Sequence, residues 1–167
     1  RCADATTVAQ NREYKLVNAV HEGRELTICS TGIGSPSAAI AAEELAAVGV
    51  ETFLRVGTTG ALQSDIEIGD TVVATGAAKD EGTTKRYEAA TVPAVAEHNV
   101  PQAATQGAEC REARGHVGAR GTADAVYAET PEEVAARSAA GLVSVEMDAG
   151  GLLTLARRKG LGEGGFC

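Results

Sequence analysis

An arginine inside an apolar run is the residue of this chain that points most directly to chemistry. Arg55 lies in the stretch Leu54-Arg55-Val56-Gly57-Thr58-Thr59-Gly60-Ala61-Leu62. Burying an unpaired guanidinium is costly, so Arg55 is expected either to pair with a carboxylate or to reach an anion near the glycine-rich turn. Threonine hydroxyls and exposed backbone N–H groups are typical of a phosphate or oxyanion pocket.

Two carboxylates flank an apolar residue in Val145-Glu146-Met147-Asp148. Paired carboxylates accept hydrogen bonds from vicinal hydroxyls, the arrangement that binds a ribose. The alternative interpretation is structural, with Asp148 capping the helix that follows.

A third segment, Cys29 to Ser37, joins an expected strand to an expected helix through Gly32 and Gly34. Its backbone amides are candidates for anion binding at a helix N-terminus, and a plain tight turn is the alternative. A P-loop is excluded because no Gly-Lys-Ser/Thr follows.

The charge of the chain limits its partners. With 167 residues and a formal net charge of −8, the chain fits one domain whose overall field repels nucleic acid and anionic lipid. No apolar run reaches the ~18 residues of a membrane span. We therefore expect a cytoplasmic protein without nucleic-acid or membrane partners. The acidic, lysine-poor composition also resembles that of proteins adapted to high salt, a hypothesis that a melting temperature indifferent to molar KCl would contradict.

The cysteines and histidines form no metal-binding pattern. Their positions are scattered: Cys2, Cys29, Cys110, Cys167, His21, His98 and His116. We expect reduced thiols and no metal site.

Apolar periodicity and turn residues predict alternating strands and helices. Strands are expected at 24–30, 50–56, 71–75, 116–122 and 142–145, and helices at 37–48, 102–113, 131–141 and 148–159. Residues 79–93 are expected to form a long loop, and the first strand, helix and strand a parallel crossover. The predicted fold is a single α/β domain with a mixed, mostly parallel central sheet flanked by helices. Ligands should gather at the carboxyl ends of its strands.

Taken together, the motifs resemble the nucleoside phosphorylase family, which includes uridine phosphorylase and the hexameric purine nucleoside phosphorylases. The resemblance rests on residues 30–37, 53–61, 68–73 and 145–149, in the family's order and approximate spacing. Thr58-Thr59-Gly60 and Asp80-Glu81-Gly82-Thr83-Thr84 look more like the uridine branch. The implied fold is phosphorylase/hydrolase-like.

The resemblance implies reversible phosphorolysis of a nucleoside, uridine preferred, to free base and pentose 1-phosphate. Arg55 and Thr58 would be the catalytic pair and bind phosphate, joined by Arg12 from a neighbouring subunit. Glu146, Met147 and Asp148 would bind ribose, and Val126 and Tyr127 would line the base pocket. The resemblance implies no cofactor, inorganic phosphate as co-substrate, and a homo-oligomer built from dimers, with a hexamer as one arrangement.

Several departures from the family pattern keep alternatives open. The family's Gly-Asp-Pro turn does not precede Arg1, and its last strand is expected to be missing or degraded near Cys167. We therefore expect residues 1–167 to form a phosphorylase-like domain that is incomplete at both ends. Asp148 replaces the usual glutamate, and Ala128-Glu129-Thr130 replaces the pair that reads uracil in the uridine enzymes. The alternatives are a catalytically inactive or fragmentary member that retains nucleoside and phosphate binding, a purine nucleoside phosphorylase, and a nucleosidase that uses water.

Overall fold

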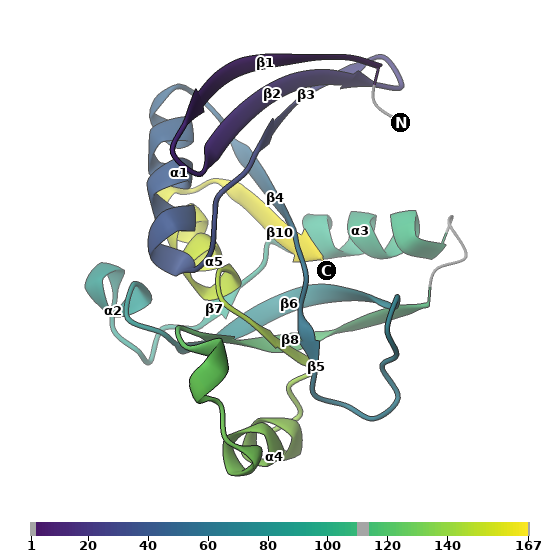
Figure 1. Ribbon diagram of the computed structural model, residues 1–167, viewed down its shortest axis with the longest axis vertical. Helices are drawn as coiled ribbons and strands as arrows, with labels where there is room; N and C mark the ends of the chain where they lie inside the picture. The colour runs from purple at the N-terminus through teal and green to yellow at the C-terminus, as the bar shows by residue number, and fades with distance from the viewer. Residues whose placement is uncertain (1–2, 110–113, 167) are drawn as a thin grey trace. The chain divides into compact units, whose positions relative to one another are not determined.

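The computed structural model describes residues 3–109 and 114–166, and its secondary structure is shown in Figure 1. The chain divides into two compact units, Arg1–Ile33 and Gly34–Cys167. Each unit is described by itself.

The first unit is a three-stranded antiparallel sheet. Strands β1 (Ala3–Asn11), β2 (Tyr14–His21) and β3 (Arg24–Cys29) follow one another in the order β1-β2-β3. The turn between β2 and β3 has positive φ at both Glu22 (51°) and Gly23 (76°), which matches the twist of a tight antiparallel hairpin. The strand predicted at 24–30 is thus confirmed. The predicted parallel crossover is wrong, because the hairpin pairs β3 with β2 and not with the next strand of the chain.

The second unit contains a seven-stranded mixed sheet of order β4-β10-β6-β8-β9-β5, with β7 paired to β6. The longest pairing, β6 with β8, is parallel, as are β10 with β4 and β8 with β9. The remaining pairs are antiparallel. The strands are β4 (Thr52–Val56), β5 (Gly60–Ala61), β6 (Thr71–Asp80), β7 (Ala94–Val95), β8 (Gly115–Ala123), β9 (Ser144–Glu146) and β10 (Gly162–Phe166). The predicted α/β fold with a mixed sheet is confirmed.

Helices connect these strands. They are α1 (Ser35–Ala47), α2 (Thr84–Tyr87), α3 (Asn99–Glu109), the 3-10 turn η1 (Val126–Ala128), α4 (Pro131–Ala139) and α5 (Ala149–Lys159). The predicted start of α4 is confirmed, because Thr130 and Glu133 form a reciprocal capping box. The segment 79–93, predicted as a loop, instead contains the end of β6 and the short helix α2. Helix α3 begins three residues earlier than predicted, and its predicted end at 113 lies outside the described residues.

A strand, β10, is present near Cys167, at Gly162–Phe166, whereas the expected incompleteness of the domain at both ends stays a prediction. Gly160, with φ of 68°, ends α5 in the left-handed conformation and turns the chain back into the sheet. β10 then pairs with β4 on one side and β6 on the other. A glycine-rich strand is held there because ladder hydrogen bonds are made by the backbone and require no side chain.

Helices α1 and α5 pack closely against each other. Their shared core consists of Ala38, Ala39, Ala42, Leu152 and Leu155, with Phe53 and Tyr87 against it. A Cβ atom at Gly151 would lie 2.9 Å from Cβ and Oγ of Ser35. The glycine that weakens α5 as an isolated helix therefore allows it to approach α1.

Within residues 3–109 and 114–166, no helix is long and apolar enough to cross a membrane. Cys29 is a free thiol, and partial burial raises its pKa. Cys2, Cys110 and Cys167 lie outside the described residues.

Candidate active site

Strand β4 presents Arg55 to two carboxylates from the junction of β9 and α5. Nη2 of Arg55 lies 2.6 Å from Oδ2 of Asp148 and 3.3 Å from Oε2 of Glu146. The three side chains are 13%, 11% and 1% exposed. The sequence predicted that Arg55 pairs either with a carboxylate or with a bound anion. In the structure Arg55 forms ion pairs with two carboxylates. This pairing joins two of the sequence motifs into one site.

Glu146 positions the backbone of the site. Its Oε1 accepts a hydrogen bond from Oγ1 of Thr122 at 2.7 Å, and its Oε2 accepts from the N–H groups of Asp148 (2.8 Å) and Ala149 (2.9 Å). These two N–H groups open helix α5, so Glu146 caps that helix. The structural interpretation had assigned the cap to Asp148, which makes no side-chain cap bond.

Asp148 retains an unused acceptor. Its Oδ2 takes the hydrogen bond from Arg55, whereas its buried Oδ1 has no hydrogen-bond partner within the described part of the chain. A buried carboxylate oxygen without a donor is costly, so this atom is suited to a hydroxyl of a bound ligand. Met147 lies between the two carboxylates, and its carbonyl accepts a hydrogen bond from Oγ of Ser35 at 3.1 Å.

The turn after β4 is shaped by Arg55 and by a threonine. A Cβ atom at Gly57 would lie 2.8 Å from Nη2 of Arg55, so the guanidinium occupies the space that a side chain would need. Oγ1 of Thr59 donates to the carbonyl of Val145 at 2.7 Å, which fixes the turn to strand β9. Thr58 is exposed. Of the two threonines, Thr59 has a structural bond and Thr58 presents the accessible hydroxyl.

One of the two residues predicted to line the base pocket adjoins a small cavity of about 30 Å³. Val126 lines it together with Glu146 and Met147, so the cavity joins η1 to the predicted ribose residues. Tyr127 is fully exposed and does not line it. Glu129 does line it, and this residue was missing from the sequence-based list of site residues.

Glu129 belongs to a charged group that also contains Arg137 of α4 and Asp80 of β6. Nη1 of Arg137 in α4 donates to Oε1 of Glu129, and Nη2 of the same arginine donates to Oδ2 of Asp80 at 2.9 Å. The bond to Asp80, followed by the charge of Glu129, raises the pKa of Arg137 against the opposing effect of burial. No sequence signal marks this group, because Asp80 and Arg137 are 57 residues apart and belong to different motifs.

Arg12 is exposed at the turn between β1 and β2 and belongs to the first unit of the chain. Its φ of 53° is that of a tight hairpin turn. Its role in a neighbouring subunit's phosphate site stays a prediction.

The segment from Cys29 to Ser37 carries structural bonds at its start. Oγ of Ser30 donates to the carbonyl of Glu13 at 2.6 Å and accepts from the N–H of Lys15 at 2.8 Å. Gly34, with φ of 90°, precedes the first residue of α1, and α1 has no side-chain cap.

The segment Asp80 to Thr84 is built around a buried glutamate. Glu81 is fully buried and accepts hydrogen bonds from the N–H groups of Thr83 and Thr84. The N–H of Gly82 donates to Oδ2 of Asp124 at 2.9 Å, which holds this segment beside the residues that precede η1. The segment is therefore held beside η1, whose Val126 lines the small cavity.

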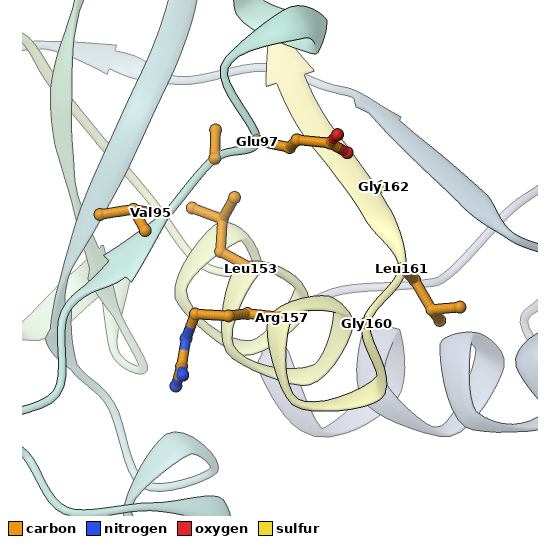
Figure 2. A pocket seen from close by; sticks show the side chains of 8 residues that line it. Val95, Glu97, Leu153, Arg157, Gly160, Leu161 and Gly162 are labelled. Carbon is orange, nitrogen blue, oxygen red and sulfur yellow. The ribbon is translucent and has the colours of Figure 1, made fainter.

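A larger cavity of about 410 Å³ lies elsewhere (Figure 2). Figure 2 shows it between α5, β7 and the start of β10, with Glu97 and Arg157 among its lining residues. None of the predicted site residues lines it. Across residues 3–109 and 114–166, no group of three His, Cys, Asp or Glu is arranged to hold a metal ion.

Comparison with known proteins identifies a matching family and several similar proteins. The sequence model of the phosphorylase superfamily matches residues 1–167. A guanosine phosphorylase of Halorubrum lacusprofundi is 56% identical over 166 residues, which are 99% of this chain and 69% of that protein. The uridine phosphorylase of Thermococcus kodakarensis is 45% identical over 124 residues, covering 74% of this chain and 45% of the relative.

A solved structure is similar over nearly the whole chain. The crystal structure of uridine phosphorylase from Vibrio fischeri ES114 superposes with a TM-score of 0.92 at 35% identity, covering 98% of this chain and 69% of that chain. The chain thus spans just over two thirds of the length of the Halorubrum lacusprofundi and Vibrio fischeri proteins and less than half of the length of the Thermococcus kodakarensis protein. The chain belongs to the phosphorylase superfamily and is an enzyme of the nucleoside phosphorylase, or pentosyltransferase, class.

Proposed function

We propose that this protein catalyses the reversible phosphorolysis of a nucleoside. A phosphate oxygen forms a bond to the anomeric carbon of the ribose while the bond from that carbon to the base nitrogen breaks. The base leaves with the bonding electrons and takes up a proton, and the pentose 1-phosphate is the second product. The observation that carries the proposal is Arg55 between Glu146 and Asp148, with Oδ1 of Asp148 left without a donor.

The proposed roles follow from the contacts of each side chain. Arg55 and the exposed Thr58 bind and orient the phosphate, because one supplies a permanent positive charge and the other a hydroxyl donor. Asp148 and Met147 bind the ribose, with Oδ1 of Asp148 accepting from a ribose hydroxyl. Glu146 contributes mainly by holding Arg55 and capping α5, since both of its oxygens already accept hydrogen bonds.

Catalysis under this proposal depends on positioning and electrostatics. The transition state carries positive charge on the ribose, and the carboxylate of Asp148 is placed to stabilise it. Arg55 lies against that carboxylate, so phosphate bound by Arg55 is held close to the sugar. Orienting the two reactants removes much of the entropic barrier to their reaction.

The base is proposed from two observations that favour different substrates. Thr58-Thr59-Gly60 and the segment Asp80 to Thr84 favour uridine. The relative that is 56% identical is named a guanosine phosphorylase, and this favours guanosine as the second candidate.

A phosphate-dependence assay tests the reaction. The protein is incubated with uridine or guanosine, with and without inorganic phosphate, and free base and pentose 1-phosphate are measured. Arg55→Ala should lose phosphate-dependent cleavage, and Arg24→Ala, which removes an exposed arginine in the first unit, should retain it. Equal base release without phosphate would indicate a nucleosidase, and binding without any release would indicate an inactive member.

The proposal includes a homo-oligomer. Arg12 is exposed at a hairpin turn, as a residue lent to another subunit must be, and strand β4 exposes Leu54 (53%) and Val56 (65%) at the edge of the described sheet. Light scattering measures the oligomer. Mixing inactive Arg12→Ala and Arg55→Ala proteins should restore part of the activity if Arg12 acts across subunits, and no recovery would contradict that role.

A further inference from the structure

Glu129 brings a carboxylate to the cavity beside the predicted ribose residues. The cavity is lined by Ala123, Val126, Glu129, Val145, Glu146 and Met147. In the proposed nucleoside site the ribose contacts Met147 and Asp148, and the base is assigned to the neighbouring side of the cavity, formed by η1 and the residue that follows it. Glu129 is the charged residue of that side.

The orientation of Glu129 is fixed by neighbouring charges. Arg137 joins Glu129 to Asp80, and the side chains of Glu129 and Arg137 are 17% and 15% exposed. Arg137 binds Oε1 of Glu129, and among the described residues Oε2 of Glu129 accepts no hydrogen bond. The ion pair thus holds one oxygen of Glu129, and the second is available to accept a hydrogen bond from a ligand.

A carboxylate can only accept hydrogen bonds, and this selects among bases. Guanine presents a ring N–H next to an exocyclic amino group, so two donors lie side by side on its Watson–Crick edge. Uracil presents one N–H between two carbonyl oxygens, and a carboxylate repels both oxygens. Sites built to hydrogen-bond a polar group discriminate strongly against analogues that lack it.

We propose that Glu129 is a specificity-determining residue that reads the base through adjacent N–H donors, so that the enzyme prefers 2-amino-6-oxopurine nucleosides such as guanosine over uridine. The proposal rests on the proposed nucleoside site. Arg137 is a positioning residue, since it acts on the base only through Glu129.

A comparison of guanosine with inosine measures the contribution of the exocyclic amino group, the second donor of guanine. Hypoxanthine keeps the ring N–H but lacks the 2-amino group. A hydrogen bond to a charged group contributes about 1.5–3 kcal/mol, which corresponds to a preference for guanosine over inosine of roughly tenfold or more. The expected order of kcat/KM is guanosine, then inosine, then uridine.

The test compares wild type, Glu129→Gln and the control Glu132→Gln. Glu132 is an exposed glutamate in the first turn of α4, so the control removes the same charge nearby without touching the cavity. For each protein, kcat/KM for guanosine, inosine and uridine is measured with saturating phosphate. Glu129→Gln keeps the shape but replaces one acceptor by a donor. It should lower kcat/KM for guanosine at least tenfold, leave uridine unchanged or improved, and leave the melting temperature within a few degrees.

Equilibrium binding of guanosine and uridine, measured by calorimetry, separates this inference from the proposed reaction. Tighter binding of guanosine that Glu129→Gln abolishes supports the inference even if no phosphorolysis occurs. The inference is overturned if wild type binds or turns over uridine as well as guanosine, if it binds neither, or if Glu129→Gln affects both nucleosides equally. Arg137→Met provides a second variant, which should weaken guanosine more than uridine.

Discussion

Replacing Arg55 by methionine should destabilise the fold as well as abolish phosphate binding. Methionine keeps much of the aliphatic volume but removes the positive charge between Glu146 and Asp148. Both carboxylates contact the same nitrogen, at 3.3 and 2.6 Å, and their side chains are 1% and 11% exposed. Without Arg55, two poorly hydrated negative charges remain close together.

The expected magnitude follows from this burial. Removing one partner of a buried ion pair costs about 3–5 kcal/mol, because the other charge stays buried and uncompensated. The partial exposure of Asp148 allows some hydration, so the lower end, about 3 kcal/mol, is expected here. For a chain of this size 1 kcal/mol shifts the melting temperature by about 2–4 °C, which gives a decrease of roughly 10 °C.

The assay is urea and thermal unfolding of wild type, Arg55→Met, Asp148→Asn and the double variant. Removing both charges relieves the repulsion, so the double variant should be more stable than the sum of the single effects predicts, by about 0.5–3 kcal/mol. Arg24→Met is the control and should change stability by less than about 0.5 kcal/mol.

Two results would contradict the expected contribution of Arg55 to stability. One is an Arg55→Met protein that melts within about 2 °C of wild type, since the pair would then contribute little. The other is a double variant whose destabilisation equals the sum of the two single variants, since Arg55 and Asp148 would then act independently.

Four further predictions concern residues around the site and the fold. Gly57→Ala should displace the Arg55 guanidinium, because the new Cβ would lie 2.8 Å from Nη2. Calorimetry should then show phosphate affinity reduced about tenfold or more. An unchanged phosphate affinity would contradict this geometry. Gly151→Ala should lower the free energy of unfolding by about 1–3 kcal/mol despite the better helix propensity of alanine, because its Cβ would meet Ser35 at 2.9 Å; a stabilised protein in urea unfolding would contradict this. The backbone N–H of Glu67, followed by the His116 ring, holds the pKa of Asp70 below its usual value. The stabilisation by Asp70 is therefore fully present above the usual aspartate pKa and is lost as the pH falls through the lowered pKa. The difference in free energy of unfolding between wild type and Asp70→Asn should shrink below about pH 4. A difference that does not depend on pH would contradict this prediction. Thr130→Ala should cost about 1 kcal/mol through loss of the capping box, whereas an unchanged urea midpoint would show that α4 needs no cap.

The sequence alone predicts the local elements whose signals lie within a few residues. The start of α4 is an example, because Thr130, Pro131 and Glu133 specify a helix N-terminus without help from the rest of the chain. Strand β10 is the opposite case. Its glycines carry no strand signal, and it forms because β4 and β6 present backbone groups on both sides of it.

The candidate site divides in the same way. Arg55 lies in an apolar run and therefore required a partner. Glu146 and Asp148 are two carboxylates that flank an apolar residue, which marked them as candidate site residues. The chemistry of the site could thus be predicted from the sequence. The tertiary structure brings these residues into one cluster, although Arg55 and Asp148 are 93 positions apart in the sequence. It also decided that Glu146 and not Asp148 caps α5, and that Arg137 links Glu129 to Asp80. The physical reason is that residue type fixes which partners a charge needs, whereas sheet order and helix packing fix which partners come within hydrogen-bonding distance.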